Sequence, residues 1–494
     1  MFDRCQDRDG RGAIKRLARG SHRVILAHGA LTLAVATFAL VYVIAGIDAA
    51  SLIYPVSAVL TTVVCWCVWS WRDCGGSLGD PYCMFLLSAI LFNAGQEVLL
   101  ALHVTDFALL GGRFDPGTQI NVILMTLAGL TAMHFGALVT MWHPPQKRLP
   151  RPVSQAINRP TGTRITGYLM LAVAIVPAII EMRAALSTVA ARGYMGLYQK
   201  EIPTGFANAT AMLAAFLVPG CLFLLAGSAR RRFPILLSLC AAVLHVLVAF
   251  VLGGRGTGAM LIVAYLWVWN RSVKRIFKAA IAVVVPLGAI ILFPLIASIR
   301  NTRLGERADL ASILDAFHAI DNPILSLMSE LGASARVLAH TSELVPSIRS
   351  FDWGISYVYA LMTVIPNVWG GIHPTIAHGT LSLWLVQTVE PLTAASGGGL
   401  GFSFIAEAYL NFGWLGMFTV MPMIGWLVGR LALRSGNCPE VSSLALIACI
   451  IGPLLFYARS ETADLCRSIV WYAAVPYLLA RSIDRYSNTS RRFQ

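Results

Sequence analysis

Long apolar runs dominate this sequence and limit what it can fold into. About twelve such runs recur along the 494 residues, near 24–46, 52–71, 82–103, 119–142, 165–182, 207–228, 233–252, 257–270, 278–298, 407–431, 441–457 and 467–481. A bilayer core requires about 20 helical residues, because their backbone hydrogen bonds must be satisfied within the segment. Since 57% of the residues are hydrophobic and only 13% are charged, the ordinary soluble class is excluded. The sequence predicts an all-α polytopic membrane protein with about 12 transmembrane helices.

The positions of the basic residues explain the formal net charge of +14 without a nucleic-acid partner. They gather in alternate loops, and the positive-inside rule assigns such loops to the cytoplasm. This set comprises the arm from Arg4 to Arg23, the 143–164 loop, Arg230 to Arg232, the 271–278 loop, Arg430 with Arg434, and the tail from Arg481 to Arg492. Both termini are then cytoplasmic, which requires an even number of spans.

One segment outside the predicted spans is large. Residues 299–406 lie between the ninth and tenth spans, on the outer face. Apolar residues between positions 310 and 317 share one face of a predicted helix, and Asn322-Pro323 is a helix start signal. No internal repeat or low-complexity linker separates this segment from the spans. We therefore expect residues 1–494 to form a single integral membrane domain in which 299–406 is a large helical loop.

The ten cysteines do not indicate a disulfide framework or a metal site. Six of them fall inside predicted spans, and the sequence has no CxxC…CxxC arrangement. No DxD-like pair of carboxylates stands at a convincing place either. We expect neither a bound metal nor a cofactor.

Arginine dominates the cations that this topology leaves outside, and its guanidinium binds phosphate through two parallel hydrogen bonds. Arg255 stands between glycines in "GGRG", where backbone N–H groups and the start of the next helix attract an anion. A simple turn with a solvated arginine is the alternative. Arg300 and Arg303 lie three apart at the outer end of the ninth span, where snorkelling to lipid headgroups is the alternative. Arg192 and Arg459 are reserve candidates, and local ion pairing explains Arg459 equally well.

Glu407 is a carboxylate at the edge of a predicted span, and such carboxylates have a partner or a task. It lies in "GGGLGFSFIAEAYLNFGWLG", where the glycines permit close approach to the backbone. Tyr409 and Asn411 add polar groups within one helical turn. A structural ion pair with an arginine is the alternative to a functional role.

The same stretch resembles the segment G-x-S-x-x-x-E-x-Y-x-N-F-G-x-x-G of the Wzy-type O-antigen polymerases. The matching positions are Gly401, Ser403, Glu407, Tyr409, Asn411, Phe412, Gly413 and Gly416. "GGRGTGAM" is similar to the arginine-glycine turn of that family, and "VIPNVWGG" is similar to its proline-tryptophan segment. The arginine-x10-glycine motif of some members has no counterpart, because Leu266 stands eleven residues after Arg255.

The resemblance implies a glycosyltransferase of GT-C-like architecture in the bacterial inner membrane, with its active site facing the periplasm. The substrate would be an oligosaccharide repeat unit on a polyprenyl (undecaprenyl) diphosphate, within membrane lipids, and a chain-length regulator protein is a further candidate partner. A hydroxyl of one unit would attack the anomeric carbon of another glycan and displace the diphosphate. Such a reaction requires cations for the leaving group and a base for the hydroxyl proton.

These requirements give each candidate residue a predicted role. The general base is expected to be Glu407, then His378 or His373. The predicted diphosphate ligands are Arg255, Arg300, Arg303, Arg192 and Arg459, and the predicted glycan contacts are Tyr409, Asn411 and Trp369.

Two other functions remain open at this stage. An O-antigen ligase uses the same donor but transfers the glycan to lipid A core, and only the glutamate segment favours a polymerase. A flippase or secondary transporter would form no bond. Transporters commonly show two pseudo-symmetric halves and charges at the centre of their spans. In this sequence the ionisable residues gather at the outer ends and one loop dominates, which disfavours transport.

Overall fold

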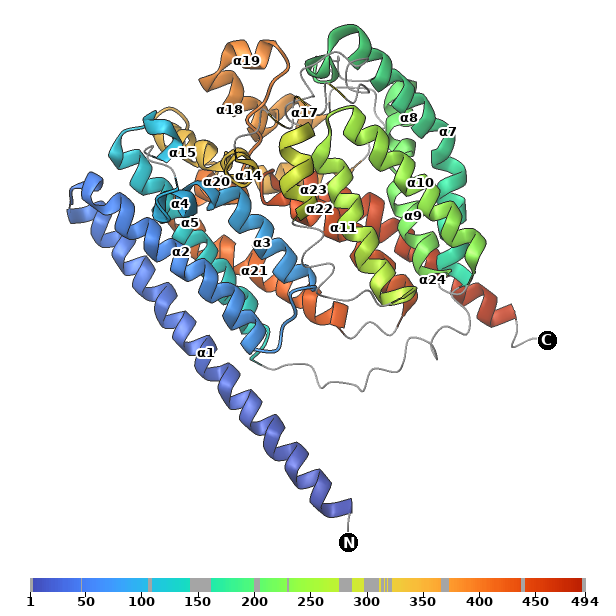
Figure 1. Ribbon diagram of the computed structural model, residues 1–494, viewed down its shortest axis with the longest axis horizontal. Coiled ribbons are helices and arrows are strands. Elements are labelled where there is room, and N and C mark those ends of the chain that lie inside the picture. The colour runs from blue at the N-terminus through green and yellow to red at the C-terminus, as the bar shows by residue number, and fades with distance from the viewer. Residues whose placement is uncertain are drawn as a thin grey trace. The chain divides into compact units, whose positions relative to one another are not determined.

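The structure is a computed structural model that describes residues 3–45, 47–104, 109–142, 161–199, 205–228, 231–274, 287–296, 311, 315, 318, 322–365, 373–436 and 440–490. Every regular element in these ranges is a helix, as predicted (Figure 1). The chain divides into two compact units. The first unit comprises Met1–Arg148, Leu331–Ser356 and Phe402–Asn437, and the second unit comprises Leu149–Glu330, Tyr357–Gly401 and Cys438–Gln494.

Seven helices in the described ranges are long and apolar enough to cross a membrane. They are Ser21–Ala45 of α1 (Asp3–Ala45), α2 (Ala49–Asp73), α5 (Pro116–Val139), α7 (Thr161–Arg192), Ala209–Ala226 of α8 (Gly205–Ala214) and α9 (Leu217–Ala226), α10 (Arg232–Val251) and α21 (Trp414–Gly436). An eighth candidate, α3 (Pro81–Asn93) with α4 (Gly95–Ala101), is bent by 68°. Two apolar helices, Leu287–Ile296 and α22 (Val441–Tyr457), are shorter. A multi-pass membrane protein is therefore confirmed, whereas the count of twelve spans stays a prediction.

The predicted span at 407–431 is divided into two helices in the structure. α20 (Phe404–Phe412) ends at Gly413, and α21 begins at Trp414. Gly413 has φ +57°, a conformation that glycine adopts far more easily than other residues. A β-carbon there would also lie 3.1 Å from the ring of Phe351. Glu407 consequently lies on α20, ahead of the candidate membrane span α21.

The first unit has its core at the contact between α5 and α21. Small residues allow this approach: a methyl group at Gly136 would overlap the carbonyl of Pro422, and one at Gly425 would overlap the carbonyl of Met133. α5 starts at Pro116, and the preceding Asp115 accepts a hydrogen bond from the Thr118 N–H at 3.1 Å. α1 and α2 pack on other faces of α5.

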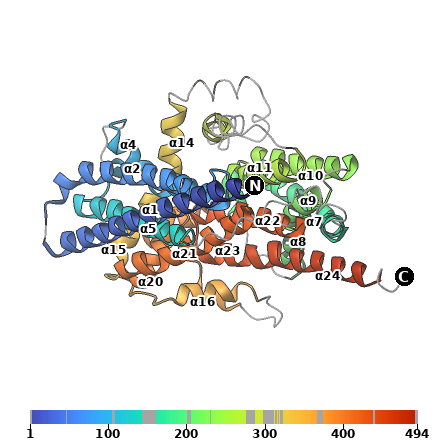
Figure 2. The ribbon, with the colours of Figure 1, turned by 90° about the horizontal axis from the view of Figure 1, so that it is seen from below.

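The second unit is built around α7, which packs against α8, α9 and α24 (Val475–Ser490) (Figure 2). α11 (Arg255–Ser272) packs against α22 and α10. The Gly162 N–H donates to the Asp484 carboxylate at 2.7 Å, which joins the start of α7 to α24. α23 (Thr462–Ile469) and the π-helical turn η4 (Val470–Ala474) lie between α22 and α24.

The described part of the 299–406 region consists of short helices. They are α14 (Pro323–Leu331), α15 (Ser334–Leu344), α16 (Ile355–Met362), α17 (Pro374–His378), α18 (Leu381–Val389) and α19 (Pro391–Ala395). The predicted helix start at Asn322 is confirmed, because its side chain accepts hydrogen bonds from the N–H groups of Ile324 and Leu325 at 3.1 and 3.0 Å. The apolar residues of the face predicted between positions 310 and 317 lie outside the described residues: Leu310, Ile313, Leu314 and Phe317.

Candidate functional site

The structure separates the predicted site residues into two groups. Glu407, Tyr409 and Asn411 belong to the first unit. The other described candidates belong to the second unit: Arg192, Arg255, His373, His378 and Arg459. Arg300, Arg303 and Trp369 lie outside the described residues.

Glu407 forms the centre of a buried hydrogen-bond network in the first unit. Its side chain is only 1% exposed, and its carboxylate accepts a hydrogen bond from the Ser356 hydroxyl at 3.0 Å. Asn411 lies one helical turn later on the same face of α20. The Asn411 amide donates to the Ser356 oxygen at 2.8 Å and accepts from the Gly354 N–H at 2.8 Å. The network therefore fastens residues 354–356 to α20.

Backbone hydrogen bonds reinforce this attachment. The N–H groups of Asp352 and Trp353 donate to the carbonyls of Leu410 and Asn411 at 3.1 and 3.0 Å. Trp353 has φ +50° and is 70% exposed, so it lies at the tip of the turn. Asn411 itself is fully buried, and both ends of its amide contact protein groups. Its predicted contact with a glycan would require this network to open.

Tyr409 lies on another side of α20, among aromatic rings. Its ring centroid is 6.3 Å from that of Phe351 and 6.2 Å from that of Trp414. The side chain is half-buried, so one part of it remains accessible to a ligand. Phe351, Trp353 and Tyr409 thus form an aromatic cluster at this end of the first unit.

A second buried contact fixes the start of α20. The Ser403 hydroxyl donates to the Asn93 side-chain oxygen at 2.6 Å, and Ser403 also accepts from the Ile405 N–H as the N-cap. Asn93 is the last residue of α3, next to the bend into α4. Glu97, in α4, is fully buried, and neither carboxylate oxygen has a hydrogen-bond partner within the part of the chain that the structure describes.

Arg255 makes a bidentate ion pair in the second unit. It is the first residue of α11, directly after Gly253 (φ +87°) and Gly254. One guanidinium nitrogen donates to Glu330 Oε2 at 2.7 Å and to the Phe293 carbonyl at 2.9 Å, and the other donates to Glu330 Oε1. The arginine side chain is 12% exposed. The alternative of a solvated arginine in a simple turn is therefore wrong.

The glycine run approaches the chain's own residues closely. A β-carbon at Gly397 would lie within 3.1 Å of Tyr198 and Gln199, and Gln199 donates to the Ser396 carbonyl at 2.8 Å. At the other end, a β-carbon at Gly401 would lie 3.3 Å from the Arg459 carbonyl. The run therefore connects Arg459 with the turn that follows Arg192. Arg192 itself is exposed at the end of α7.

The two histidines have different surroundings. His373 uses both ring nitrogens: Nδ1 contacts the Thr375 hydroxyl at 2.6 Å, and Nε2 contacts the Ile365 carbonyl at 3.1 Å. His378 is exposed, and its ring stacks on Tyr359 with centroids 4.0 Å apart and an interplanar angle of 10°. Only His378 thus combines an accessible imidazole with a fixed ring plane.

Glu461 is a buried carboxylate that sequence reasoning did not select. It is 6% exposed and accepts hydrogen bonds from the Leu381 N–H at 2.9 Å and the Ser382 hydroxyl at 3.3 Å. These contacts place it at the N-terminus of α18, where the helix dipole favours a negative charge. Burial nevertheless raises the pKa of Glu461 to about 7, and the nearby Asp464 carboxyl adds to the rise.

Two further contacts attach the same part of the 299–406 region. The Thr363 hydroxyl donates to the Ala463 carbonyl at 3.4 Å, and the Trp471 indole donates to the Val364 carbonyl at 2.9 Å. Together with the contacts of Glu461, these bonds hold residues 363–364 and 381–382 to the stretch from Glu461 to η4. No signal in the sequence joins these pairs, because they lie about a hundred residues apart.

One group of residues has the composition of a metal site. The ligand atoms of His28, Cys67 and His134 lie within 4.8 Å of one another and are buried in the first unit. However, His28 contacts the Thr131 carbonyl at 2.9 Å and accepts from the Trp66 indole at 3.1 Å. His134 contacts the hydroxyls of Tyr82 and Ser70 at 2.7 and 2.8 Å. A metal ion would have to displace these hydrogen bonds, so the arrangement fits a structural network better.

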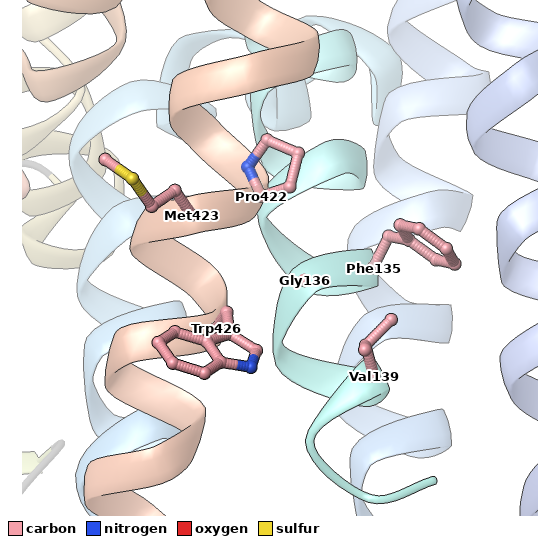
Figure 3. Close-up of a pocket in the computed structure, with 6 residues that line it drawn as sticks. All are labelled: Phe135, Gly136, Val139, Pro422, Met423 and Trp426. Carbon is pink, nitrogen blue, oxygen red and sulfur yellow. The ribbon is translucent and has the colours of Figure 1, made fainter.

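A shallow apolar groove of about 330 Å³ lies on the contact between α5 and α21 (Figure 3). It is lined by Phe135, Gly136, Val139, Pro422, Met423 and Trp426. Its lining offers almost no polar surface. A diphosphate or a sugar needs charged or hydrogen-bonding partners, so this groove is not the catalytic site.

Comparison with known proteins decides the family. A family model described as "O-antigen polysaccharide polymerase Wzy" matches residues 31–489, nearly the whole chain. The chain belongs to the Wzy family. No curated protein and no solved structure matches the sequence. Membership supports a polymerase role in O-antigen synthesis, and the Wzy match includes both the Glu407 network and the Arg255 ion pair.

Proposed function

We propose that this protein joins polyprenyl-diphosphate-linked oligosaccharide repeat units into O-antigen or a related surface polysaccharide. The reaction takes place at the periplasmic face of the bacterial inner membrane, and undecaprenyl diphosphate is the carrier. The observation that carries the proposal is the family match over residues 31–489. An arginine at the start of α11 that already holds an anion through two parallel hydrogen bonds supports it.

The proposed reaction is one glycosyl transfer per added unit. A hydroxyl oxygen of one lipid-linked unit forms a bond to the anomeric carbon of the glycan on another carrier. The bond from that carbon to the diphosphate oxygen breaks, and the diphosphate leaves with the electron pair. The hydroxyl proton passes to a base on the protein.

Arg255 stabilises the leaving diphosphate in this scheme. Its guanidinium matches two phosphate oxygens, and it is largely shielded from water, where a fixed charge interacts more strongly. The first N–H groups of α11 lie next to it and favour an anion at the same place. Arg192 and Arg459, in the same unit, are secondary ligands for the diphosphate, and Arg300 and Arg303 remain candidates.

The base is proposed to be His378. A base that contacts the substrate must be accessible, and His378 is exposed, whereas Glu407 is 1% exposed. His373 is disfavoured because its two nitrogens are occupied. Glu407 acts instead as a positioning residue, since its bond to Ser356 holds the aromatic turn at 351–353 that we propose to contact the glycan together with Tyr409.

A pair of variants separates the two roles of Glu407. In Glu407→Gln the amide oxygen can still accept a hydrogen bond from Ser356. If Glu407 is a positioning residue, this variant therefore retains most of the polymerase activity. If Glu407 is the general base, the same variant lacks the carboxylate that accepts the proton, and the polymerase activity is lost. His378→Asn should abolish polymer formation while the protein stays folded. Loss of activity in Glu407→Gln with full activity in His378→Asn would reverse the assignment.

The remaining parts of the proposal concern topology and partners. The apolar runs and the alternation of basic loops support twelve spans and two cytoplasmic termini. The family match supports a GT-C-like arrangement. A chain-length regulator protein is the proposed partner in the membrane. Single cysteines introduced at positions 300–310 and near the two termini test the orientation. Those at 300–310 should be accessible from the periplasm, and those near the termini should not.

The activity itself is tested with purified full-length protein and a lipid-linked repeat unit as the sole substrate. Gel analysis should show a ladder of longer lipid-linked products. Transfer that occurs only after lipid A core is added would indicate a ligase. Absence of any bond formation, with movement of the substrate across a vesicle membrane, would indicate a transporter.

A further inference from the structure

Glu330 occupies the edge of Arg255 that a diphosphate would use. The two carboxylate oxygens face the two terminal nitrogens of the guanidinium, in the parallel geometry that carboxylates and phosphates share. The Phe293 carbonyl accepts a further hydrogen bond from one of these nitrogens, and the Phe293 ring centroid is 5.8 Å from the guanidinium carbon. The arginine thus contacts the Phe293 carbonyl and ring and pairs with the Glu330 carboxylate.

The two partners differ in accessibility. The side chain of Arg255 is 12% exposed, and that of Glu330 is 32% exposed. Glu330 is therefore the partner that can move into solvent. It is the penultimate residue of α14, so a change at the end of this short helix would move it.

We propose that Glu330 is a placeholder for the substrate anion: it pairs with Arg255 when no diphosphate is bound, and the diphosphate of the lipid-linked donor displaces it. The inference rests on the proposed function of Arg255. It assigns to Glu330 a role in the affinity for the donor and in release of the carrier.

The physical reason for such an exchange is the cost of an unpaired charge in a shielded place. A guanidinium that loses its partner without a replacement leaves an uncompensated, poorly solvated cation. Exchange of a carboxylate for a diphosphate keeps the cation paired at every stage. After the glycan has been transferred, return of the carboxylate helps to expel the polyprenyl diphosphate, so release is faster than it would be from a bare arginine site.

Binding of farnesyl diphosphate to the purified full-length protein tests the inference. Isothermal titration in detergent, without divalent metal, compares the wild type with Glu330→Gln and Arg255→Ala. We expect Glu330→Gln to bind about three- to tenfold more tightly, because the competing charge is gone, and Arg255→Ala to bind at least about tenfold more weakly. Glu440→Gln is the matched control, since Glu440 pairs with Arg481 at 3.6 Å on an exposed surface. It should bind as the wild type does.

Steady-state kinetics give a second readout that a merely structural role would not produce. In Glu330→Gln both KM for the lipid-linked unit and kcat should fall, because the donor binds more tightly and the carrier leaves more slowly. If Glu330→Gln does not fold, Glu330→Asp replaces it. The shorter carboxylate weakens the pair while it keeps the charge, and farnesyl diphosphate should again bind more tightly than to the wild type.

The outcomes distinguish the inference from the proposed function. Unchanged or weaker binding in folded Glu330→Gln or Glu330→Asp, together with weaker binding in Arg255→Ala, overturns the placeholder and leaves Arg255 as the diphosphate ligand. If Arg255→Ala binds farnesyl diphosphate as tightly as the wild type does, the diphosphate does not bind at Arg255. That result overturns both the placeholder role of Glu330 and the proposed role of Arg255. Tighter binding in the Glu330 variant with weaker binding in Arg255→Ala supports the exchange.

Discussion

Replacement of Glu461 by glutamine should remove a large part of the pH dependence of stability. In the folded protein, burial raises the pKa of Glu461 from its ordinary value of 4.5 to about 7. The folded state therefore favours the protonated carboxyl. Stability from this group is fully present below about pH 4.5 and is lost as the pH rises through about 7.

The magnitude follows from the size of the shift. Each pKa unit corresponds to about 1.4 kcal/mol, so ionisation of Glu461 costs the folded state on the order of 3 kcal/mol above pH 7. Glutamine is uncharged at every pH. Its oxygen can accept from the Leu381 N–H, and its amide can donate to the Ser382 hydroxyl, so the contacts at the start of α18 are retained.

Thermal unfolding of purified full-length protein, followed by intrinsic fluorescence between pH 4.5 and 8.5, tests this prediction. Glu461→Gln should match the wild type near pH 4.5 and be clearly more stable at pH 8. The exposed Glu440→Gln is the control and should follow the wild type throughout. A Glu461→Gln variant that is less stable than the wild type at pH 8 would refute the reasoning, because the ionised carboxylate would then be the stabilising form.

Three further substitutions test the packing and the buried polar groups. Gly425→Ala should destabilise the protein by about 1–3 kcal/mol, since the methyl group overlaps the Met133 carbonyl; Gly436→Ala, on the same helix with open space around it, should be nearly neutral in the same unfolding assay. Asn411→Ala should cost about 1–3 kcal/mol, because it leaves the partly buried Gly354 N–H without its acceptor, and protease cleavage in this turn should become faster. Glu97→Leu should raise the unfolding temperature, because both buried carboxylate oxygens lack partners in the described part of the chain, and a lower temperature would show that this carboxylate is paired.

The sequence predicted the helical membrane class because apolar runs of span length have few alternatives in a bilayer. It also predicted the start of α14, since the signal at Asn322 is local. The division of the predicted span at Gly413 into α20 and α21 was not predicted. The residues on both sides are apolar, and hydropathy carries no information about a positive φ. Glu407 was selected as unusual, and the structure supplies the reason: a buried partner, Ser356, that lies 51 residues away.

Pairings over long distances in the sequence explain most of the remaining differences. The glycine neighbours of Arg255 predict an anion partner, and the carboxylate with which it pairs, Glu330, is 75 residues away in the sequence. Glu461 lies two residues after Arg459 in the sequence, whereas its hydrogen bonds are with Leu381 and Ser382 at the start of α18. A single sequence has no signal for such contacts. Features that depend on neighbouring residues could therefore be predicted from the sequence. Contacts between residues that are far apart in the sequence could not.

The measurement that tests the central claim most directly is product length in the assay with lipid-linked repeat unit as the only substrate, for the wild type and Arg255→Ala side by side. We expect a ladder of elongated lipid-linked glycans from the wild type and none from the folded variant. No elongation by the wild type with intact substrate, or an equal ladder from Arg255→Ala, would contradict it.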